Sequence, residues 1–231
     1  MPGGKRTDHI SRRDLEVLEF IARFGVVPRS AVAVWANTAS TVTHERERRL
    51  RQEGLIEVLA PVGDSGKLLL CTPAGLRAAG RGDLRRAKLS FAAVRHESAV
   101  ALLAARMERG GERTLSEREI LARERAEGKR VLSAGLSGGR FHRADLIRVG
   151  EDGEPREAIE VELTTKGANR LDALLRAWRR AVAERRVSGV VYRCAPRTRP
   201  YVERAIERTR TAGAVAVEEL WTETSEPRVT S

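Results

Sequence analysis

Residues 50–75 read LRQEGLIEVLAPVGDSGKLLLCTPAG, and this stretch decides the fold that we expect for the N-terminal part of the chain. Two apolar runs, residues 55–62 and 67–72, have the composition of strands and enclose the turn sequence GDSG at 63–66. Upstream, apolar residues at helical spacing predict helices over residues 11–25, 28–36 and 38–52. The pattern therefore predicts three helices followed by a hairpin, with a further helix beginning in TPAG.

This order of elements strongly resembles winged helix-turn-helix DNA-binding domains, and the stretches LRQEGLIEV and LLLCTPAG carry the resemblance within residues 9–85. It implies that the third helix enters the major groove of duplex DNA and that the hairpin touches the DNA backbone. We expect Val42 and Leu50 to point inward. The side chains expected to face DNA are Ser40, Thr41, Thr43, His44, Arg46, Arg48, Arg49, Arg51 and Lys67. A merely solvated helix is the alternative, because Glu45, Glu47 and Glu53 dilute its positive charge.

The composition favours a polyanionic partner. The 231 residues contain 43 Lys and Arg against 32 Asp and Glu, a formal net charge of +11, and only five of the basic residues are Lys. Arginine presents a planar, always-charged group that suits phosphate, although a GC-rich genome would also enrich it. No apolar run reaches the length of a membrane span, and MPGGKRTDHI lacks a signal-peptide pattern, so we expect no membrane partner. Two cysteines provide neither a disulfide framework nor a four-cysteine zinc site, which favours a cytoplasmic location.

The second half of the chain mixes helix and strand patterns. Helical spacing covers residues 94–108, 168–186 and 199–210. Strand-like runs cover residues 114–120, 141–149, 158–164, 189–195 and 214–220. This order predicts a mixed sheet flanked by helices in a second domain over residues 91–222. The whole chain is therefore expected to be α/β, or α+β overall.

Acidic residues on two of these strands indicate a metal site. In AIEVELTTK, residues 158–166, apolar residues alternate with Glu160 and Glu162, so both glutamates share a face with Cα atoms roughly 7 Å apart. Asp145 lies on the preceding strand, and pairing of the two strands would bring three carboxylates together. Such oxygen ligands suit Mg²⁺ or Mn²⁺, which can activate water and stabilise charge on a phosphate, with Lys166 as a further positive group. An ordinary exposed strand face would alternate in the same way without any metal.

Residues 94–220 resemble the PD-(D/E)XK nuclease superfamily, which has the restriction-endonuclease-like fold, in their element order and in these acids. The resemblance implies that Asp145 is the first metal-binding acid and that Glu160 opens the second motif. Glu97, on the preceding helix, resembles an extra glutamate that some members use.

Two positions depart from that superfamily pattern. Ala144 stands where a proline is usual, and Glu162 stands where a lysine is expected two residues after Glu160. Lys166 would then supply the lysine from a shifted position, or Glu162 marks a site that has lost its nuclease function. The catalytic candidates are Asp145, Glu160, Glu162 and Lys166, and the metal ligands are Asp145, Glu160 and Glu97.

The whole chain resembles the replication–relaxation family, in which a winged helix precedes this type of C-terminal region. The stretches CTPAG, VRHESAVALL, LSEREI, HRADLI and IEVELTTK carry the resemblance. It implies a protein that binds double-stranded DNA and has a metal-dependent endonuclease domain, and a homodimer would allow both strands to be cut. The alternative is a non-catalytic DNA-binding factor of plasmid replication, transfer or transcription with a degenerate nuclease-like domain.

Several other residues have structural interpretations. His142 lies next to Arg143 at the start of a loop, where nothing else in the sequence supports a contact with DNA. Trp178 falls on the apolar stripe of the helix over 168–186, where we expect it in the core. Cys194 is expected to be buried and inert. Arginines on that helix would follow a DNA backbone or be solvated: Arg176, Arg179, Arg180, Arg185 and Arg186.

Overall fold

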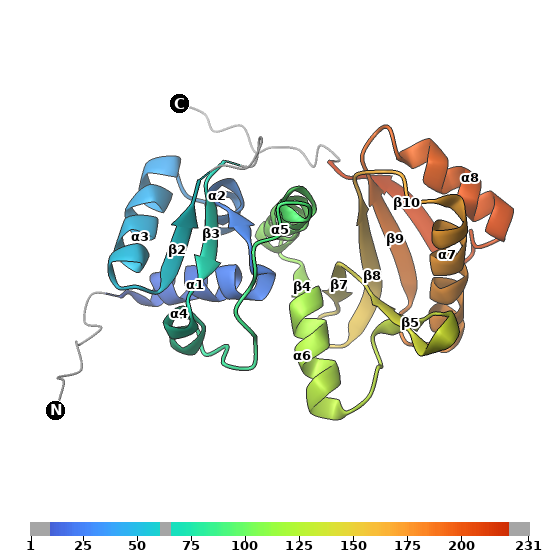
Figure 1. Cartoon of the computed structure of the whole chain (residues 1–231), viewed down its shortest axis with the longest axis horizontal. Coiled ribbons are helices and arrows are strands. Elements are labelled where there is room, and N and C mark those ends of the chain that lie inside the picture. The colour runs from blue at the N-terminus through green and yellow to red at the C-terminus, as the bar shows by residue number, and fades with distance from the viewer. Residues whose placement is uncertain (1–9, 61–65, 222–231) are drawn as a thin grey trace. The chain divides into compact units, whose positions relative to one another are not determined.

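The computed structural model describes residues 10–60 and 66–221, and the chain divides into two units, Met1–Lys129 and Arg130–Ser231. Both units contain helices and strands (Figure 1), which confirms the mixed α/β class expected from the sequence. The division falls between Lys129 and Arg130, whereas the expected N-terminal domain ended at residue 85. The elements between residues 94 and 127 therefore belong to the first unit.

The first unit begins with helices and a small antiparallel sheet in the order β1-β3-β2. Its elements are α1 (Arg12–Phe24), β1 (Val27–Pro28), α2 (Arg29–Ala36), α3 (Ser40–Gln52), β2 (Ile56–Leu59), β3 (Leu68–Cys71), α4 (Pro73–Ala78), α5 (Val94–Arg109), β4 (Arg113–Ser116) and α6 (Glu117–Glu127). The three expected helices and both expected strands are present. The turn expected at residues 63–66 lies mostly outside the described residues.

Local sequence explains where α1 begins and ends. Ser11 is the N-cap, and its hydroxyl accepts a hydrogen bond from the backbone N–H of Asp14, whose carboxylate accepts one from the N–H of Ser11. Gly25 ends the helix with a φ of 82°, which an L side chain rarely adopts. Between these ends, α1 buries an apolar face that includes Leu18 and Ile21.

The strand expected over residues 114–120 is wrong after Ser116. Ser116 is the N-cap of α6, because its hydroxyl accepts from the N–H of Glu119 and the Glu119 carboxylate accepts from the N–H of Ser116. This capping box satisfies the first free N–H groups of a helix and starts α6 directly after the short strand β4.

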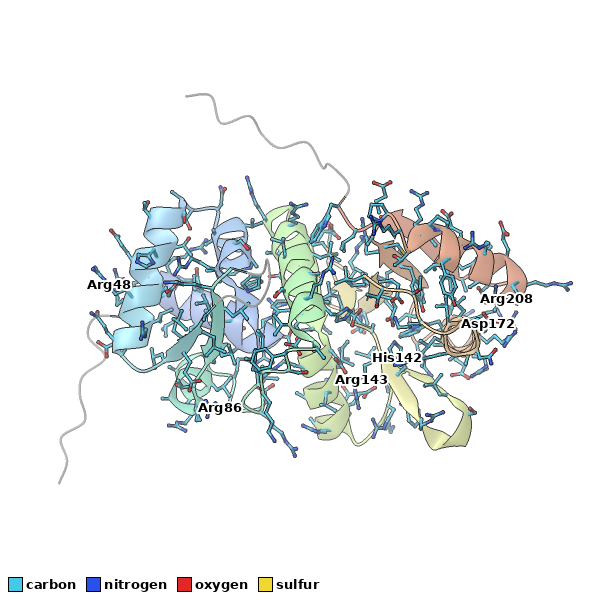
Figure 2. The ribbon with its side chains drawn as sticks, turned by 45° about the horizontal axis from the view of Figure 1, so that its top comes forward. Arg48, Arg86, His142, Arg143, Asp172 and Arg208 are labelled. Carbon is cyan, nitrogen blue, oxygen red and sulfur yellow. The ribbon has the colours of Figure 1, made fainter. Side chains whose placement is uncertain are left out.

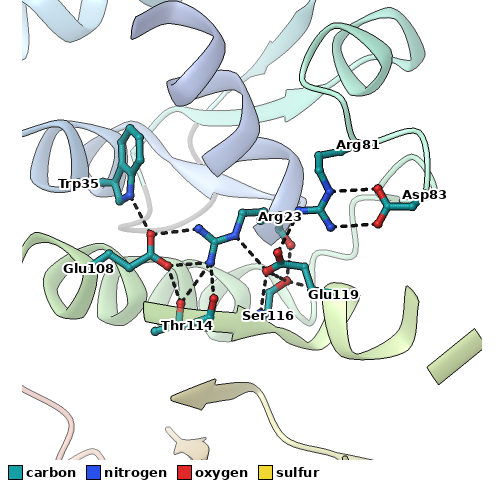
Figure 3. A network of polar contacts seen from close by, with 8 residues as sticks. All are labelled: Arg23, Trp35, Arg81, Asp83, Glu108, Thr114, Ser116 and Glu119. Atoms are coloured by element: carbon teal, nitrogen blue, oxygen red, sulfur yellow. Dashed lines mark hydrogen bonds and ion pairs between the residues drawn. The ribbon is translucent and has the colours of Figure 1, made fainter. Parts of the chain in front are cut away.

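A buried network joins the end of α1 to α5, β4 and α6 within the first unit (Figure 3). Arg23 donates to both carboxylate oxygens of Glu108, at 2.7 and 3.0 Å, and to Glu119 at 3.0 Å. Arg81 donates to the other oxygen of Glu119 at 2.9 Å, and the Trp35 indole donates to Glu108 at 2.9 Å. Burial alone would lower the pKa of Arg23, but the two carboxylates raise it. These contacts explain why α5 and α6 belong with the first three helices.

The second unit is a sheet covered by two helices. Its elements are β5 (Ser133–Gly135), a 3₁₀ turn (Ser137–Gly139), β6 (Phe141–Arg143), β7 (Leu146–Val149), β8 (Pro155–Glu162), α7 (Ala168–Ala183), β9 (Gly189–Cys194), α8 (Arg199–Thr209) and β10 (Val215–Glu219). Within this unit the strand order is β10-β9-β8-β7, with β8, β9 and β10 parallel and β7 antiparallel to β8. The helices α7 and α8 pack on each other and on one side of the parallel strands (Figure 1).

The single strand expected over residues 141–149 is two strands in the structure. β6 pairs with β5 in a separate two-stranded hairpin, whereas β7 pairs with β8. Ala144 and Asp145 lie between them and belong to neither strand. The apolar pattern runs through both strands, so it does not reveal that their hydrogen-bonding partners differ.

α7 and the residues that follow it bind the β5–β6 hairpin. Arg180 donates to the carbonyl oxygen of Gly135 at 2.8 Å, and Arg186 donates to that of Ser133 at 3.1 Å. Arg179 also donates to a backbone carbonyl, that of Arg210, at 3.4 Å. Three of the arginines expected to follow DNA or face solvent therefore bind backbone within the unit. No helix within residues 10–60 and 66–221 is long and apolar enough to cross a membrane.

Candidate functional site

Pairing of β7 with β8 brings together the acidic residues singled out in the sequence. Leu146 lies opposite Ile159, so the same register continued by one residue places Asp145 opposite Glu160. One Asp145 carboxylate oxygen accepts a hydrogen bond from the backbone N–H of Val161 at 2.7 Å. We call Asp145, Glu160 and Glu162 the acidic cluster.

The two glutamates of the acidic cluster are buried. Glu160 is 2% exposed and Glu162 is 4% exposed, and the apolar residues between and beside them on β8 are buried as well. This burial is inconsistent with an ordinary exposed strand face, which was the alternative interpretation of the alternating glutamates without any metal. Buried carboxylates require nearby positive charges or hydrogen-bond donors, and both glutamates have such partners.

Lys166 provides the positive charge for Glu162. Its ammonium forms an ion pair with the Glu162 carboxylate, and the Tyr201 hydroxyl donates to the Lys166 carbonyl oxygen at 2.6 Å. Burial raises the pKa of Glu162, the lysine opposes that effect, and the neighbouring carboxylates add to it. The structure thus brings together the four residues proposed as catalytic, with Lys166 directed at Glu162.

His142 and Trp178 provide the hydrogen bonds to Glu160. The His142 Nε2 lies 2.7 Å from Glu160 Oε1, and the Trp178 indole N–H donates to the same oxygen at 3.0 Å. Burial works to lower the pKa of His142, but the charges of Glu160 and Asp145 raise it above its ordinary value. Neither residue was assigned to the site from the sequence, because nothing in the local pattern indicates that β6 and α7 meet at β8.

Tyr192 completes the site from the neighbouring strand. It lies opposite Glu160 on β9 and is fully buried. Burial raises the pKa of Tyr192 well above its usual value, and the three carboxylates of the acidic cluster raise it further. Among the described residues, its hydroxyl has no hydrogen-bond partner. A buried hydroxyl without a partner costs about 1–3 kcal/mol, so this position favours a polar ligand or water.

Glu97, the third expected metal ligand, lies on α5 of the first unit. It is half-buried, and one of its carboxylate oxygens has no hydrogen-bond partner among the described residues. Burial raises its pKa, and His96 and Arg118 oppose that effect. Cys194, in the second unit, is buried as expected, and burial raises the pKa of its thiol to about 12.

The outer face of α3 is a second candidate site, in the first unit. Most of the side chains expected to face DNA are exposed on it or on the adjacent hairpin: Ser40, Thr41, His44, Arg48, Arg51 and Lys67. Figure 2 shows Arg48 on this helix. Arg46 is only half-buried, and its Nη1 atom has no hydrogen-bond partner among the described residues. The positions 41, 44, 48 and 51 follow helical spacing, so their side chains form one continuous stripe.

Three expectations for α3 change in the structure. Thr43 is buried and its hydroxyl donates to the carbonyl oxygen of Ala39 at 3.2 Å, so it does not face outward as a DNA contact would. Arg49 remains 42% exposed, but its guanidinium donates to the buried Asp14 at 2.7 Å. Val42, expected to point inward, is 38% exposed, whereas Leu50 is buried as expected. Glu47 is buried in an ion pair with Arg29 and therefore does not dilute the charge of the exposed stripe.

Comparison with known proteins gives no assignment: no protein-family model and no curated sequence matches the chain. Within residues 10–60 and 66–221, no group of three His, Cys, Asp or Glu side chains is already arranged to hold a metal ion. The acidic cluster and the exposed stripe of α3 are therefore the features of this chain that bear on its function.

Proposed function

We propose that this chain binds double-stranded DNA through its first unit and hydrolyses phosphodiester bonds at the acidic cluster of its second unit, using Mg²⁺ or Mn²⁺. The observation that carries the proposal is the meeting of four residues: Asp145 directly before β7, Glu160 and Glu162 on β8, and Lys166 in the loop after β8. The resemblance to PD-(D/E)XK nucleases and to the replication–relaxation family leads to the same function.

The first unit supports the DNA-binding part of the proposal. Three helices followed by the antiparallel strands β2 and β3 agree with a winged helix-turn-helix, in which α3 would enter the major groove. The exposed stripe of α3 combines hydroxyl groups near its N-terminus with Arg48 and Arg51 further along. Hydroxyls and arginines can bond to base edges and to phosphates, respectively.

The acidic cluster has suitable groups for a hard divalent cation. Asp145 and Glu160 would hold the ion, and the unpartnered hydroxyl of Tyr192 beside them favours a polar ligand at this position. A bound divalent cation would supply Lewis-acid stabilisation of charge on the phosphate. Lys166 would provide positive charge near a substrate phosphate, and the burial of Glu160 and Glu162 keeps bulk water away from these carboxylates.

A plasmid-nicking assay tests this proposal. Supercoiled plasmid incubated with the full chain and Mg²⁺ or Mn²⁺ should be nicked, and Asp145→Asn or Glu160→Gln should remove the nicking. Glu157→Gln is a matched control, because Glu157 lies on β8 but on the opposite face and pairs with Arg148. Loss of nicking in the control as well would contradict a specific role for the acidic cluster.

A non-catalytic DNA-binding factor of plasmid replication, transfer or transcription is the second candidate. It is favoured by the internal partners of the acids, because Lys166 pairs with Glu162 and His142 contacts Glu160 without any ion. In that case the second unit is a degenerate scaffold. Binding to duplex DNA, together with no cleavage of supercoiled, linear or single-stranded DNA, would support this function over hydrolysis.

A further inference from the structure

One oxygen of Glu160 accepts hydrogen bonds from two different elements. His142 on β6 and Trp178 on α7 both approach Oε1, at 2.7 and 3.0 Å, with their rings 6.0 Å apart and nearly perpendicular. A carboxylate can only accept, so His142 donates through Nε2–H. Both hydrogen bonds that the structure gives for the Glu160 side chain go to Oε1.

The contacts of the β5–β6 hairpin fix the position of His142, which Figure 2 shows in the second unit. His142 lies opposite Ala134 of β5, which is fully buried. The two ends of β5 are bound by Arg180 of α7 and by Arg186, which follows the end of α7. The same helix carries Trp178. The two donors to Glu160 therefore belong to one connected assembly, and the alternation along β6 directs the neighbouring Phe141 to the opposite face.

We propose that His142 is a positioning residue that, together with Trp178, holds Glu160 Oε1 so that only Oε2 is presented to a divalent cation. This inference rests on the proposed metal-dependent function and adds a residue that the sequence patterns did not indicate. A carboxylate held by two donors has a fixed orientation before the cation arrives, so binding does not have to order it. The β5–β6 hairpin is then part of the metal site although it supplies no ligand.

Mn²⁺ binding to the full-length protein tests this role without any cleavage assay. Titration with Mn²⁺, followed by the electron paramagnetic resonance signal of the free ion, should give about tenfold weaker binding for His142→Ala. His142→Gln should restore the affinity, because its amide N–H lies near the position of Nε2, whereas the shorter His142→Asn should not. Phe141→Ala is the matched control, since it alters the same strand without touching Glu160, and it should bind like the unaltered protein.

The outcomes separate the two proposals. If the unaltered protein binds Mn²⁺ more tightly than Asp145→Asn, but His142→Ala, His142→Asn and His142→Gln bind it equally well, the positioning role is wrong and the metal-dependent function stands. If the unaltered protein binds Mn²⁺ no better than Asp145→Asn, the metal-dependent function is wrong and the role of His142 is overturned with it. Should His142→Ala fail to fold, the comparison of the Gln and Asn variants decides the question.

Discussion

At the scale of single residues, neighbouring arginines on α3 have different surroundings. Arg48 is exposed on the stripe proposed to face DNA, whereas Arg49 donates to Asp14. Asp14 is fully buried and forms part of the capping box of α1. Burial works to raise the pKa of Asp14, but the hydrogen bonds from Ser11 and the charge of Arg49 lower it overall. Arg49 therefore connects α3 to the start of α1.

This difference predicts that substitutions at the two positions affect different properties, stability at Arg49 and DNA affinity at Arg48. Arg49→Ala should lower the free energy of unfolding by about 1–3 kcal/mol, because it removes a partner from a buried carboxylate. Arg48→Ala should leave stability within about 0.5 kcal/mol but weaken duplex binding and reduce the salt dependence of the affinity by about one ion. Urea denaturation and fluorescence anisotropy over a salt series measure the two effects. Equal loss of stability in both variants would contradict the structural role of Arg49 and the DNA-facing role of Arg48.

At the scale of elements, the Arg23 network connects four parts of the first unit through charge (Figure 3). Glu119 of α6 lies between Arg23 of α1 and Arg81, which follows α4. Burial works to raise the pKa of Glu119, but the two arginines and the Ser116 N–H lower it below its ordinary value of 4.5. A carboxylate whose folded pKa is lowered stabilises the fold above its unfolded pKa, and that contribution is lost as pH falls through the folded pKa.

The first unit should therefore lose stability when the pH falls below about 4.5. Glu119→Gln should lower the melting temperature at pH 7, and its further loss of stability toward pH 3 should be smaller than that of the unaltered protein. Thermal denaturation followed by circular dichroism between pH 7 and 3 measures this. Glu127→Gln serves as control, because Glu127 is exposed on the same helix and pairs with Arg123 of its own helix. An identical acid response in all three proteins would exclude the network as its source.

The packing of α5 leads to a prediction about fragments. α5 packs on α2 and β1, and Arg23 depends on carboxylates from α5 and α6. A fragment of residues 1–129 should fold, whereas residues 1–90 should not, because the latter leaves a buried arginine without its partners. Dispersion of the amide signals in nuclear magnetic resonance spectra distinguishes the two states. A well-dispersed spectrum from residues 1–90 would show that the first helices and strands are stable alone.

At the scale of the whole molecule, the proposed functions belong to separate units. The exposed stripe of α3 lies in the first unit and the acidic cluster lies in the second. Arginine side chains contact phosphates directly, without a bridging metal ion. DNA binding and hydrolysis should therefore respond differently to the removal of divalent cations.

Chelation with EDTA at constant ionic strength should stop nicking and leave duplex affinity unchanged. The affinity is measured by anisotropy and the nicking on supercoiled plasmid in the same buffers. Added Mn²⁺ should restore nicking, whereas Ca²⁺ serves as a comparison of equal charge. Loss of duplex binding on chelation would mean that the ion, rather than α3, holds the DNA.

Much of the fold could be predicted because it depends on local patterns. The helix expected over 38–52 appears as Ser40–Gln52, and the one over 168–186 appears as Ala168–Ala183, since an apolar stripe and a stop signal act within a few residues. The end of β4 at Ser116 could also be predicted, because Ser116 and Glu119 have the spacing of a capping box, which starts a helix. The division of residues 141–149 between two sheets could not be predicted from the local pattern, because the strands with which they pair are distant in sequence.

The sequence by itself determined that Glu160 and Glu162 share a face of a strand. It also indicated that Asp145 lies beside them, although the structure places Asp145 one residue before β7 rather than within a strand. Only the tertiary structure decided what covers that face: His142 and Trp178 on Glu160, Lys166 on Glu162, and Tyr192 beside them. A period of two follows from the geometry of one strand and is therefore written in the local pattern. Burial and hydrogen bonding depend on which distant segments pack there, and that is settled only when the whole unit folds.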